Sequence, residues 1–400
     1  MGAGPGAPGP YSLTNEDKAT RYHRLRRRAE ILSTAAAGLF LLILLLTGAA
    51  LTIREFSSMI GMAIGGGYEE PATVVVFTVA LSALLFGLEL PFAFYQGFVL
   101  EHRYALSNET RGQWLRDQVK GLAVSLVLGV AGASIVYWAI RTSADVWWAI
   151  AAGILALVLV GLVQLAPVLL LPLFYTFKPL DRPALVERLI SLSERARTRI
   201  AGVFEWVLSA HTRKANAALA GMGRTRRILL SDTLLANYSD DEIEVVLAHE
   251  LSHHVHHDLW RGVALQTLLL FIGFYVAARA LSAFADPLEL RGLDDPAGLP
   301  LLLLAGGACA LIFTPVANAM SRGHERRADQ YALDTTGQPD AFISAMKRLA
   351  QQNLAEENPS RLVQWLFYSH PPIHERIEAA RRWRAEASQL PRPPVRTPGF

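Results

Sequence analysis

The stretch Val146–Phe174, VWWAIAAGILALVLVGLVQLAPVLLLPLF, contains no charged side chain. A helix needs about 20 mostly apolar residues to cross the hydrocarbon core of a bilayer. A surface helix of a soluble protein keeps one polar face, which this stretch lacks. We therefore predict that Val146–Phe174 spans a membrane.

Five further apolar runs have the same character. They cover about Ile31–Ile53, Ala72–Phe94, Gly121–Ala139, Gly262–Phe284 and Leu299–Met320. The chain as a whole is 52% hydrophobic, which is high for a soluble protein. The sequence thus predicts an integral, multi-pass membrane protein with six spans, four of which precede residue 176.

Two side chains within these runs are unusual. Glu89 is an acid inside the second run, where a charge is costly, so we expect it to face a protein or water-filled interior or to lie near the interface. Cys309 is the single cysteine, which excludes an intrachain disulfide, and it is expected to be a small buried side chain. The formal net charge of +3 is too small to indicate nucleic-acid binding.

The charged residues beside the spans predict the topology. Basic residues precede the first run and fill the loop after the second, whereas the loops after the first and fifth runs are mainly acidic. The basic residues are Lys18, Arg21, Arg24, Arg26, Arg27, Arg28, Arg103, Arg111, Arg116 and Lys120. Because cytoplasmic loops carry an excess of Lys and Arg, we expect both termini and the segments 176–261 and 321–400 to be cytoplasmic.

The composition also suggests the domain boundaries. We expect residues 1–20 to be disordered and residues 386–400 to form a flexible tail. Residues 21–175 are expected to form an N-terminal transmembrane domain of four helices, and residues 176–385 a second domain that includes the last two spans. A cleaved signal peptide is not expected, because the first apolar run is longer than the apolar core of a signal peptide and no convincing cleavage site follows it.

The region between the fourth and fifth spans has the pattern of a small folded unit. Asp181–Ile200 has helical periodicity. Phe204–Leu208 and Arg227–Leu230 are short, β-prone segments bounded by turn residues. Ser239 is a candidate helix N-cap, and the acidic residues after it suit the first turn of a helix. The predicted fold class is mainly α: a polytopic transmembrane helix bundle with a cytoplasmic domain that contains a small β-sheet.

The helix that follows Ser239 contains the pattern H-E-x-x-H at His249–His253. Residues four apart lie on one helical face, so the imidazoles of His249 and His253 can bind one ion. Zinc suits such ligands and keeps one position open for water in catalytic sites. Glu250 is then placed to act as the general base. The motif predicts a zinc metalloprotease; the alternative interpretation is a polar helix surface.

A third zinc ligand is expected from the segment Ser321–Asp329, which follows the sixth span. Glu325 is the preferred candidate, and His324 is its rival although it projects about 100° away on a helix. Asp329 lies on the same face as Glu325 and is suited to accept a hydrogen bond from a ligand imidazole. Two spans separate the motif from this segment, so both halves of the site are predicted on the same side of the membrane.

Three further histidines follow the motif. His254 projects away from the metal face. His256 and His257 return to that face but lie about 10–12 Å along the helix axis from His249, too far to bind the same ion. We expect structural or supporting roles for them, and no second metal there.

The chain resembles the type I CAAX prenyl proteases over about residues 25–385. Besides the metal motif and Ser321–Asp329, the resemblance rests on three other groups of residues. They are Phe98–Ser107 with Asp117 and Gln118, Asn216–Gly221 with Arg227–Leu235, and His370–Arg376. The resemblance implies a membrane zinc endopeptidase that cuts prenylated proteins near their C-terminus.

The resemblance also implies roles for residues outside the metal motif. An edge strand would pair with an extended peptide and set its register through backbone hydrogen bonds. His370 and Arg376 would hydrogen-bond the substrate or stabilise the oxyanion. The residues of the substrate-binding strand are Asn216, Ala217, Ala218 and Leu219.

The sequence departs from this family in three respects. Members usually have seven membrane helices, whereas the apolar runs give six, unless Ser57–Gly67 contributes another. Ser252 stands where a glycine is usual. Ala218 and Leu219 stand where aromatic residues are common, which bears on substrate preference.

Two other functions share part of this pattern. A zinc protease for quality control of membrane proteins would use the same ligands on different substrates. A metal transporter would place its ligands inside the spans and would leave Glu250 without a role. The expected partners are a peptide or lipidated-protein substrate and the lipid bilayer.

Overall fold

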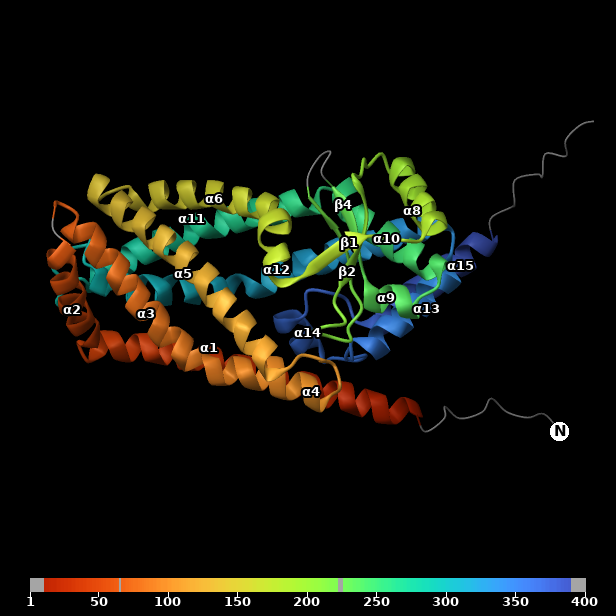
Figure 1. The fold of residues 1–400 in the computed structure, drawn as a ribbon, viewed down its shortest axis with the longest axis horizontal. Coiled ribbons are helices and arrows are strands. Elements are labelled where there is room, and N and C mark those ends of the chain that lie inside the picture. The colour runs from red at the N-terminus through yellow and green to blue at the C-terminus, as the bar shows by residue number, and fades with distance from the viewer. Residues whose placement is uncertain (1–10, 65, 222–225, 390–400) are drawn as a thin grey trace, which may run out of the picture.

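The structure is a computed structural model that describes residues 11–64, 66–221 and 226–389. Long helices build one end of the molecule, and a small sheet with shorter helices builds the other (Figure 1). The N-terminal elements are α1 (Tyr11–Leu46), α2 (Ala49–Ile64), α3 (Glu69–Phe94), a π-helical turn (Tyr95–Leu100), α4 (Glu101–Arg103), α5 (Arg111–Thr142), α6 (Trp147–Leu169) and α7 (Leu171–Phe174). Then come β1 (Thr176–Pro179), α8 (Pro183–Arg195), β2 (Gly202–Val207), β3 (Ala217–Ala220), β4 (Arg227–Ser231), α9 (Asp232–Asn237) and α10 (Asp240–Val255). The last elements are α11 (Asp258–Phe284), a 3₁₀ turn (Pro296–Gly298), α12 (Leu299–Thr336), α13 (Pro339–Gln352), α14 (Arg361–Phe367) and α15 (Ile373–Gln389).

Six helices in the described part of the chain are long and apolar enough to cross a membrane, which confirms the predicted number. They are built on α1, α3, α5, α6, α11 and α12. The predicted first run, Ile31–Ile53, differs from the structure because α1 ends at Leu46. Gly48 forms the turn with φ of +73°, a conformation that glycine adopts without strain, and α2 begins directly after it.

The helix α2 has 16 residues and lies at the end of the bundle farthest from the sheet (Figure 1). Its Arg54 donates to Asp295 over 2.6 Å, and the Asp295 side chain is fully buried. Glu55 accepts a hydrogen bond of 2.7 Å from Arg291. These contacts hold α2 against the segment that connects α11 and α12.

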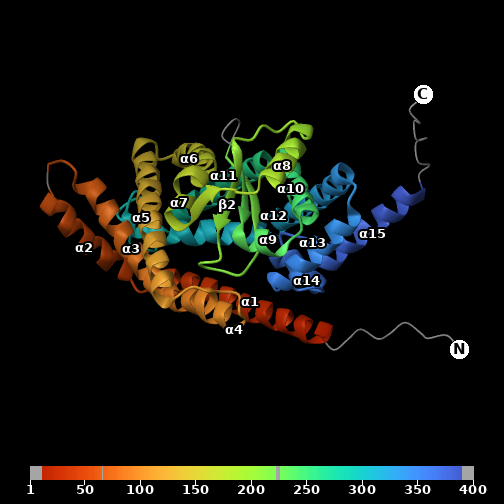
Figure 2. The ribbon, with the colours of Figure 1, turned by 45° about the vertical axis from the view of Figure 1, so that its right-hand side comes forward.

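Both described ends of the chain are more helical than the sequence suggested. The helix α1 already begins at Tyr11, inside the segment 1–20 that was expected to be disordered, and α15 continues to Gln389, inside the expected tail 386–400. Residues 1–10 and 390–400 lie outside the described residues. The start of α1 and the end of α15 lie at the same end of the molecule as the sheet (Figures 1 and 2).

The sheet is mixed and has the strand order β1-β2-β4-β3. The predicted segments Phe204–Leu208 and Arg227–Leu230 correspond to β2 and β4, which pair in parallel. The short strand β1 was not predicted; it pairs antiparallel with β2. At the other side β3 pairs antiparallel with β4 and forms the edge of the sheet. Apolar side chains from α8, β4 and α10 pack together in the core beneath the sheet.

A cavity of about 630 Å³ lies within the helix bundle. Residues from α3, α5, α6, α11 and α12 line it, among them Ser82, Gln266 and Cys309. On α12 the lining extends to Ala317, about two turns before Glu325. Cys309 is buried, as expected. Glu89 of α3 is exposed and is not among the lining residues.

Candidate metal centre

The helix α10 begins at a strong N-terminal capping signal, which fixes where the helix starts. Ser239 accepts a hydrogen bond from the amide of Glu242, and the Glu242 carboxylate accepts one from the amide of Ser239. This reciprocal pair is a capping box, which satisfies two amides that the helix leaves free. Leu247 and Leu251 of the following turns are buried in the domain core. His249 and His253, on another face, are thereby turned toward α12.

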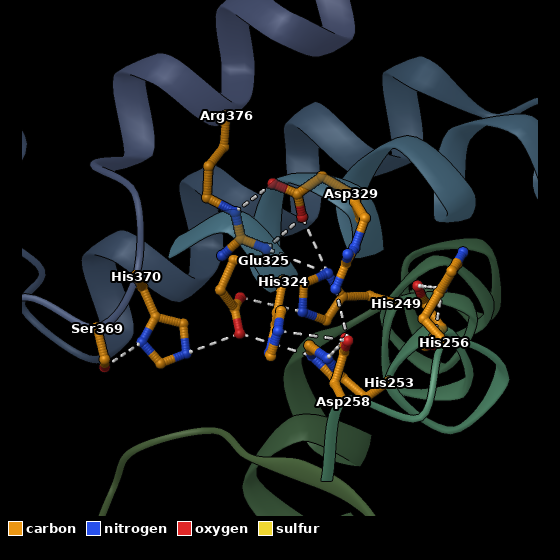
Figure 3. Close-up of polar contacts among 12 residues, drawn as sticks. His249, His253, His256, Asp258, His324, Glu325, Asp329, Ser369, His370 and Arg376 are labelled. Carbon is orange, nitrogen blue, oxygen red and sulfur yellow. Dashed lines mark hydrogen bonds and ion pairs between the residues drawn. The ribbon is translucent and has the colours of Figure 1, made fainter. Parts of the chain in front are cut away.

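The helices α10 and α12 bring three side chains from distant parts of the sequence together (Figure 3). His249 Nε2 lies 3.3 Å from one carboxylate oxygen of Glu325, and His253 Nε2 lies 3.5 Å from the other. One ligand atom from each residue lies within 4.8 Å of the others. His249 and Glu325 are buried, and His253 is half-buried. The three residues can therefore hold one ion between two helices.

The other ring nitrogen of each histidine is held by a buried carboxylate. His249 Nδ1 contacts Asp329 over 2.9 Å, as predicted for Asp329. His253 Nδ1 contacts Asp258 over 3.1 Å, a partner that sequence reasoning missed. With a proton on each Nδ1, the lone pair of each Nε2 points toward Glu325, which is the tautomer that metal binding needs.

Asp258 reaches His253 because of a sharp turn between α10 and α11. His257 adopts the left-handed conformation with φ of +56°, which is uncommon for a residue with a side chain. Asp258 is the first residue of α11 and also accepts a hydrogen bond of 2.6 Å from Arg327. In the sequence, the sign of this contact is an acidic residue five positions after His253, and the contact itself depends on the turn at His257.

The donor atoms of the trio fit a cation. The Glu325 carboxylate oxygen that lies 3.3 Å from His249 Nε2 is buried and has no hydrogen-bond partner among the described residues. It faces an imidazole nitrogen, His249 Nε2, whose proton is not needed for the bond to Asp329. Two acceptors that face each other in a buried site are costly unless a cation or a proton lies between them. Two imidazoles and a carboxylate are the ligand set that suits zinc.

The electrostatics of His249 show how strongly the site favours positive charge. Burial lowers the pKa of His249, but the contacts with Asp329 and Glu325 outweigh burial and raise the pKa to about 9. The neighbouring carboxylates therefore stabilise a cation at this position. Either a proton or a metal ion can supply that charge.

Arg376 of α15 forms an ion pair with Asp329. Its Nε donates to Asp329 over 2.8 Å, a terminal nitrogen makes a second bond to the same carboxylate, and both residues are buried. The guanidinium also lies 3.4 Å from His249 Nδ1. Burial alone would lower the pKa of Arg376, but Asp329 outweighs burial and raises it. The predicted residue is thus at the site, bound to Asp329.

The other residues predicted to lie near the trio divide into two groups. His370 Nε2 lies 3.3 Å from Glu325, and its Nδ1 lies 2.9 Å from the hydroxyl of Ser369, so His370 is part of the site (Figure 3). His324, the rival ligand, has its Nε2 3.7 Å from Asp258 and is not in the trio. Glu250 is half-buried beside the two histidines, and burial raises the pKa of its carboxyl.

The edge strand β3 lies next to α10. His254, which points away from the trio, contacts the carbonyl oxygen of Leu219 over 3.2 Å. At the start of the strand, the carbonyl of Asn216 accepts a hydrogen bond of 2.9 Å from the amide of Ser231. In an antiparallel pair alternate residues face the neighbouring strand, so the backbone groups of Ala217 and Leu219 point outward. The predicted strand is therefore an edge of the sheet, and its Leu219 carbonyl contacts the helix that carries the motif.

His256 and His257 have structural positions. His256 Nδ1 lies 3.0 Å from both the hydroxyl and the carbonyl of Ser252, and its ring packs edge-on against Tyr331. His257 forms the turn before α11. Ser252 is fully buried, so the side chain that replaces the usual glycine is accommodated.

Comparisons with known proteins agree with this geometry. Residues 179–384 match the model of peptidase family M48, and residues 9–176 match a model described as the CAAX prenyl protease N-terminal region with five membrane helices. The longer helices of that region are α1, α2, α3, α5 and α6, and all of these except α2 are long and apolar enough to cross a membrane.

Individual relatives cover most of the chain. An uncharacterized metalloprotease, YhfN, of Bacillus subtilis is 32% identical over 77% of this chain and 72% of its own. The CAAX prenyl protease 1 of Saccharomyces cerevisiae is 29% identical over 77% and 72%, respectively. The crystal structure of S. mikatae Ste24p has the same fold, with a TM-score of 0.80 at 24% identity, covering 92% of this chain and 88% of that one. The chain therefore belongs to peptidase family M48 and is a membrane metalloprotease.

Proposed function

We propose that this chain is a zinc endopeptidase that hydrolyses peptide bonds near the C-terminus of prenylated or other membrane-associated proteins. The observation that carries the proposal is the trio His249, His253 and Glu325, with Glu250 beside it and the edge strand β3 next to the same helix. The names of the yeast and other relatives as CAAX prenyl proteases support the substrate class.

In this proposal His249, His253 and Glu325 hold the zinc ion. When bound, the ion acts as a Lewis acid that polarises the scissile carbonyl and makes water a stronger nucleophile at neutral pH. Asp329 and Asp258 keep the two imidazoles in the tautomer that leaves each Nε2 free.

Glu250 acts as the general base. It accepts a proton from the attacking water and then gives a proton to the leaving amine, so its carboxylate is regenerated. The raised pKa of Glu250, which results mainly from burial, makes it a better proton acceptor than an exposed glutamate. His370 lies beside Glu325 and is the candidate donor to the oxyanion.

Arg376 fits a positioning role better than the oxyanion role that the resemblance suggests. Its guanidinium binds Asp329 through two nitrogens, and Asp329 in turn holds His249. A guanidinium so engaged orients the first zinc ligand through Asp329.

The strand β3 binds the substrate as an additional strand. The backbone of Ala217 and the amide of Leu219 point outward, where an extended peptide can pair with them, and such pairing fixes its register without demanding particular side chains. His254 of α10 contacts the carbonyl of Leu219, so β3 and a peptide paired with it are held beside the helix that carries the motif. Asn216, Ala217, Ala218 and Leu219 are thus the proposed substrate-binding residues.

We place the site and both described chain ends on the cytoplasmic side. The basic residues near α1 and before α5 support this orientation. Two spans, α11 and α12, separate the motif from Glu325, so any orientation that places one half of the site in the cytoplasm places the other half there too.

The test is Glu250→Gln in purified protein, with the exposed Glu187→Gln of α8 as a matched control. We expect Glu250→Gln to keep its zinc and to lose cleavage of a prenylated C-terminal peptide by at least about 10²-fold, since general-base catalysis is worth 10²–10⁴. Cleavage at the control rate in Glu250→Gln contradicts the assignment of the base.

The substrate is tested separately with a pair of peptides of the same sequence, one prenylated and one not. We expect the prenylated peptide to have the higher kcat/KM. Equal kcat/KM values for the two, together with cleavage of misfolded membrane proteins, favour a quality-control protease that uses the same metal centre.

A further inference from the structure

A second group of metal-binding side chains lies outside the hydrolytic site. Glu109 belongs to the loop between α4 and α5, Asp117 to the second turn of α5, and His211 to the loop between β2 and β3. One ligand atom from each lies within 4.8 Å of the others. All three are half-buried, with side chains 13%, 20% and 25% exposed, respectively. The proposed hydrolysis has no use for them.

The spacing of the three side chains suits metal coordination, and the shorter of the two contacts to His211 is also a long hydrogen bond. His211 Nδ1 lies 3.3 Å from Glu109 Oε1 and 3.5 Å from Asp117 Oδ2. A charge-assisted N–H···O bond is about 2.7–2.9 Å long. Ligand atoms of a tetrahedral zinc site, with bonds of about 2.0–2.1 Å, lie about 3.3–3.4 Å apart. The trio of the hydrolytic site shows the same pair of distances, 3.3 and 3.5 Å.

When the imidazole of His211 is neutral, the charges of the group are not balanced. Lys120 lies 3.3 Å from Oδ1 of Asp117, the oxygen that does not face His211. Two half-buried carboxylates with one lysine leave negative charge that a divalent cation neutralises.

The backbone that presents these side chains is fixed by its own hydrogen bonds. The carbonyl of His211 accepts from the amide of Asn108 and from the hydroxyl of Ser107, both over 3.0 Å. Ser107 and Thr212 form an isolated antiparallel bridge. The ring of Tyr175 packs edge-on against His211 with 5.5 Å between ring centres. The site is therefore assembled before any ion binds.

We propose that Glu109, Asp117 and His211 bind a divalent transition-metal ion, with Zn²⁺ as the best match to one imidazole and two carboxylates. The ion clamps the membrane helix α5 to the loop that leads into β3. His211 precedes β3 by six residues, so the clamp holds the proposed substrate-binding strand relative to the membrane domain.

The test uses the full-length protein with the hydrolytic site removed by the double variant His253→Ala/Glu325→Ala. This protein is saturated with Zn²⁺, freed of loose metal by gel filtration and analysed for zinc per chain. We expect one zinc per chain in this background and two in the unaltered protein. Adding Glu109→Gln or His211→Ala weakens Zn²⁺ binding by more than about 100-fold, because loss of a ligand exceeds the effect of losing a supporting residue.

A matched control is Glu205→Gln in the same background. Glu205 pairs with Lys178 over 2.9 Å and contacts no member of the group among the described residues. We expect this control to keep its zinc. Co²⁺ in place of Zn²⁺ should give visible absorption that is lost in Glu109→Gln, and Zn²⁺ should raise the Tm of the background but not that of the Glu109→Gln variant.

Two results overturn the proposal: a background protein that retains no zinc, or zinc retained in full by both Glu109→Gln and His211→Ala. Because Glu109→Gln changes no side-chain volume, an unchanged circular dichroism spectrum shows that loss of zinc is not loss of fold. The readout does not depend on peptide cleavage, so it is independent of the proposed protease activity.

Discussion

At the scale of single residues, each histidine of the proposed metal site contacts a carboxylate that lies outside the trio. Asp329 holds His249 and is held by Arg376, and Asp258 holds His253 and is held by Arg327. The two arrangements are equivalent in chemistry although their residues come from different helices. Such partners fix the tautomer of the imidazole and raise its basicity.

We predict that Asp258→Asn weakens zinc binding by about 10–100-fold, since an amide holds the His253 ring less strongly than a carboxylate. The measurement is competition with a chelator of known affinity. Asp334→Asn is the control, because Asp334 lies on the same α12 helix as Glu325 and bonds to Trp383 and Gln330. Unchanged affinity in Asp258→Asn contradicts the supporting role.

Helical spacing places His249 and His253 on one face of α10, and Glu325 and Asp329 on one face of α12, so each pair could be proposed from the sequence. The contact of Asp258 with His253 was missed because it depends on the left-handed turn at His257, which no local sequence pattern predicts. The engagement of Arg376 with Asp329 was likewise not foreseen, since it joins α12 to α15 across the domain. Contacts made by tertiary packing are outside the reach of spacing arguments.

At the scale of elements, α10 owes its position to its first turn. The Glu242 carboxylate caps the helix and accepts a hydrogen bond of 2.9 Å from Arg348 of α13. Burial raises the pKa of Glu242, but bonds from Ser344, the Ser239 amide and Arg348 outweigh burial and lower it. A lowered pKa in the folded state means that the ionised carboxylate stabilises the fold.

We therefore predict that Glu242→Gln lowers the free energy of unfolding by about 1 kcal/mol at neutral pH. The difference from the unaltered protein should be fully present above the ordinary glutamate pKa and should shrink as pH falls through the lowered folded-state pKa. Thermal unfolding across a series of pH values measures it, with exposed Glu187→Gln as control. A difference that grows toward acid pH contradicts this account.

The edge strand gives a second prediction at this scale. Ala217→Pro removes an outward amide while leaving the ladder to β4 intact, a position where proline is tolerated. We expect kcat/KM for peptides to fall about tenfold, the equivalent of one hydrogen bond. Ala217→Ser keeps the amide and serves as control. Equal kcat/KM in both variants argues against strand pairing at β3.

The elements themselves were predicted unevenly. The six apolar helices, β2 and β4 follow from composition and periodicity, because each is long or flanked by clear turn residues. The helix α2 was not separated from α1, since its apolar residues continue the first run and only Gly48 marks the break. The four-residue strand β1 is too short to carry a pattern of its own.

At the scale of the whole molecule, the N-terminal part of α1 is joined to the peptidase domain. Arg27 donates to Glu356 over 2.6 Å and to the hydroxyl of Tyr368 over 3.0 Å. Tyr368 also accepts a bond of 2.7 Å from Arg322 through its carbonyl and stands two residues before His370. The first membrane helix thus holds the segment that carries the candidate oxyanion donor.

We predict that Arg27→Met lowers kcat about tenfold without changing zinc content, because a small displacement of His370 is costly in a preorganised site. Arg24→Met is the control, since Arg24 is exposed on the same helix and carries the same charge. Steady-state kinetics and zinc analysis of both variants decide the matter. Loss of zinc in Arg27→Met points instead to general unfolding.

The length of α12 links the protein to the physical state of its membrane. Its 38 residues make a rod of about 57 Å, nearly twice the thickness of the hydrocarbon core, and no loop interrupts it between Leu299 and Glu325. A lipid bilayer that thins or thickens changes the tilt of such a rod. Glu325 moves with the rod, whereas His249 and His253 belong to a helix that does not cross the membrane. A change in bilayer thickness that tilts α12 would therefore shift Glu325 relative to His249 and His253.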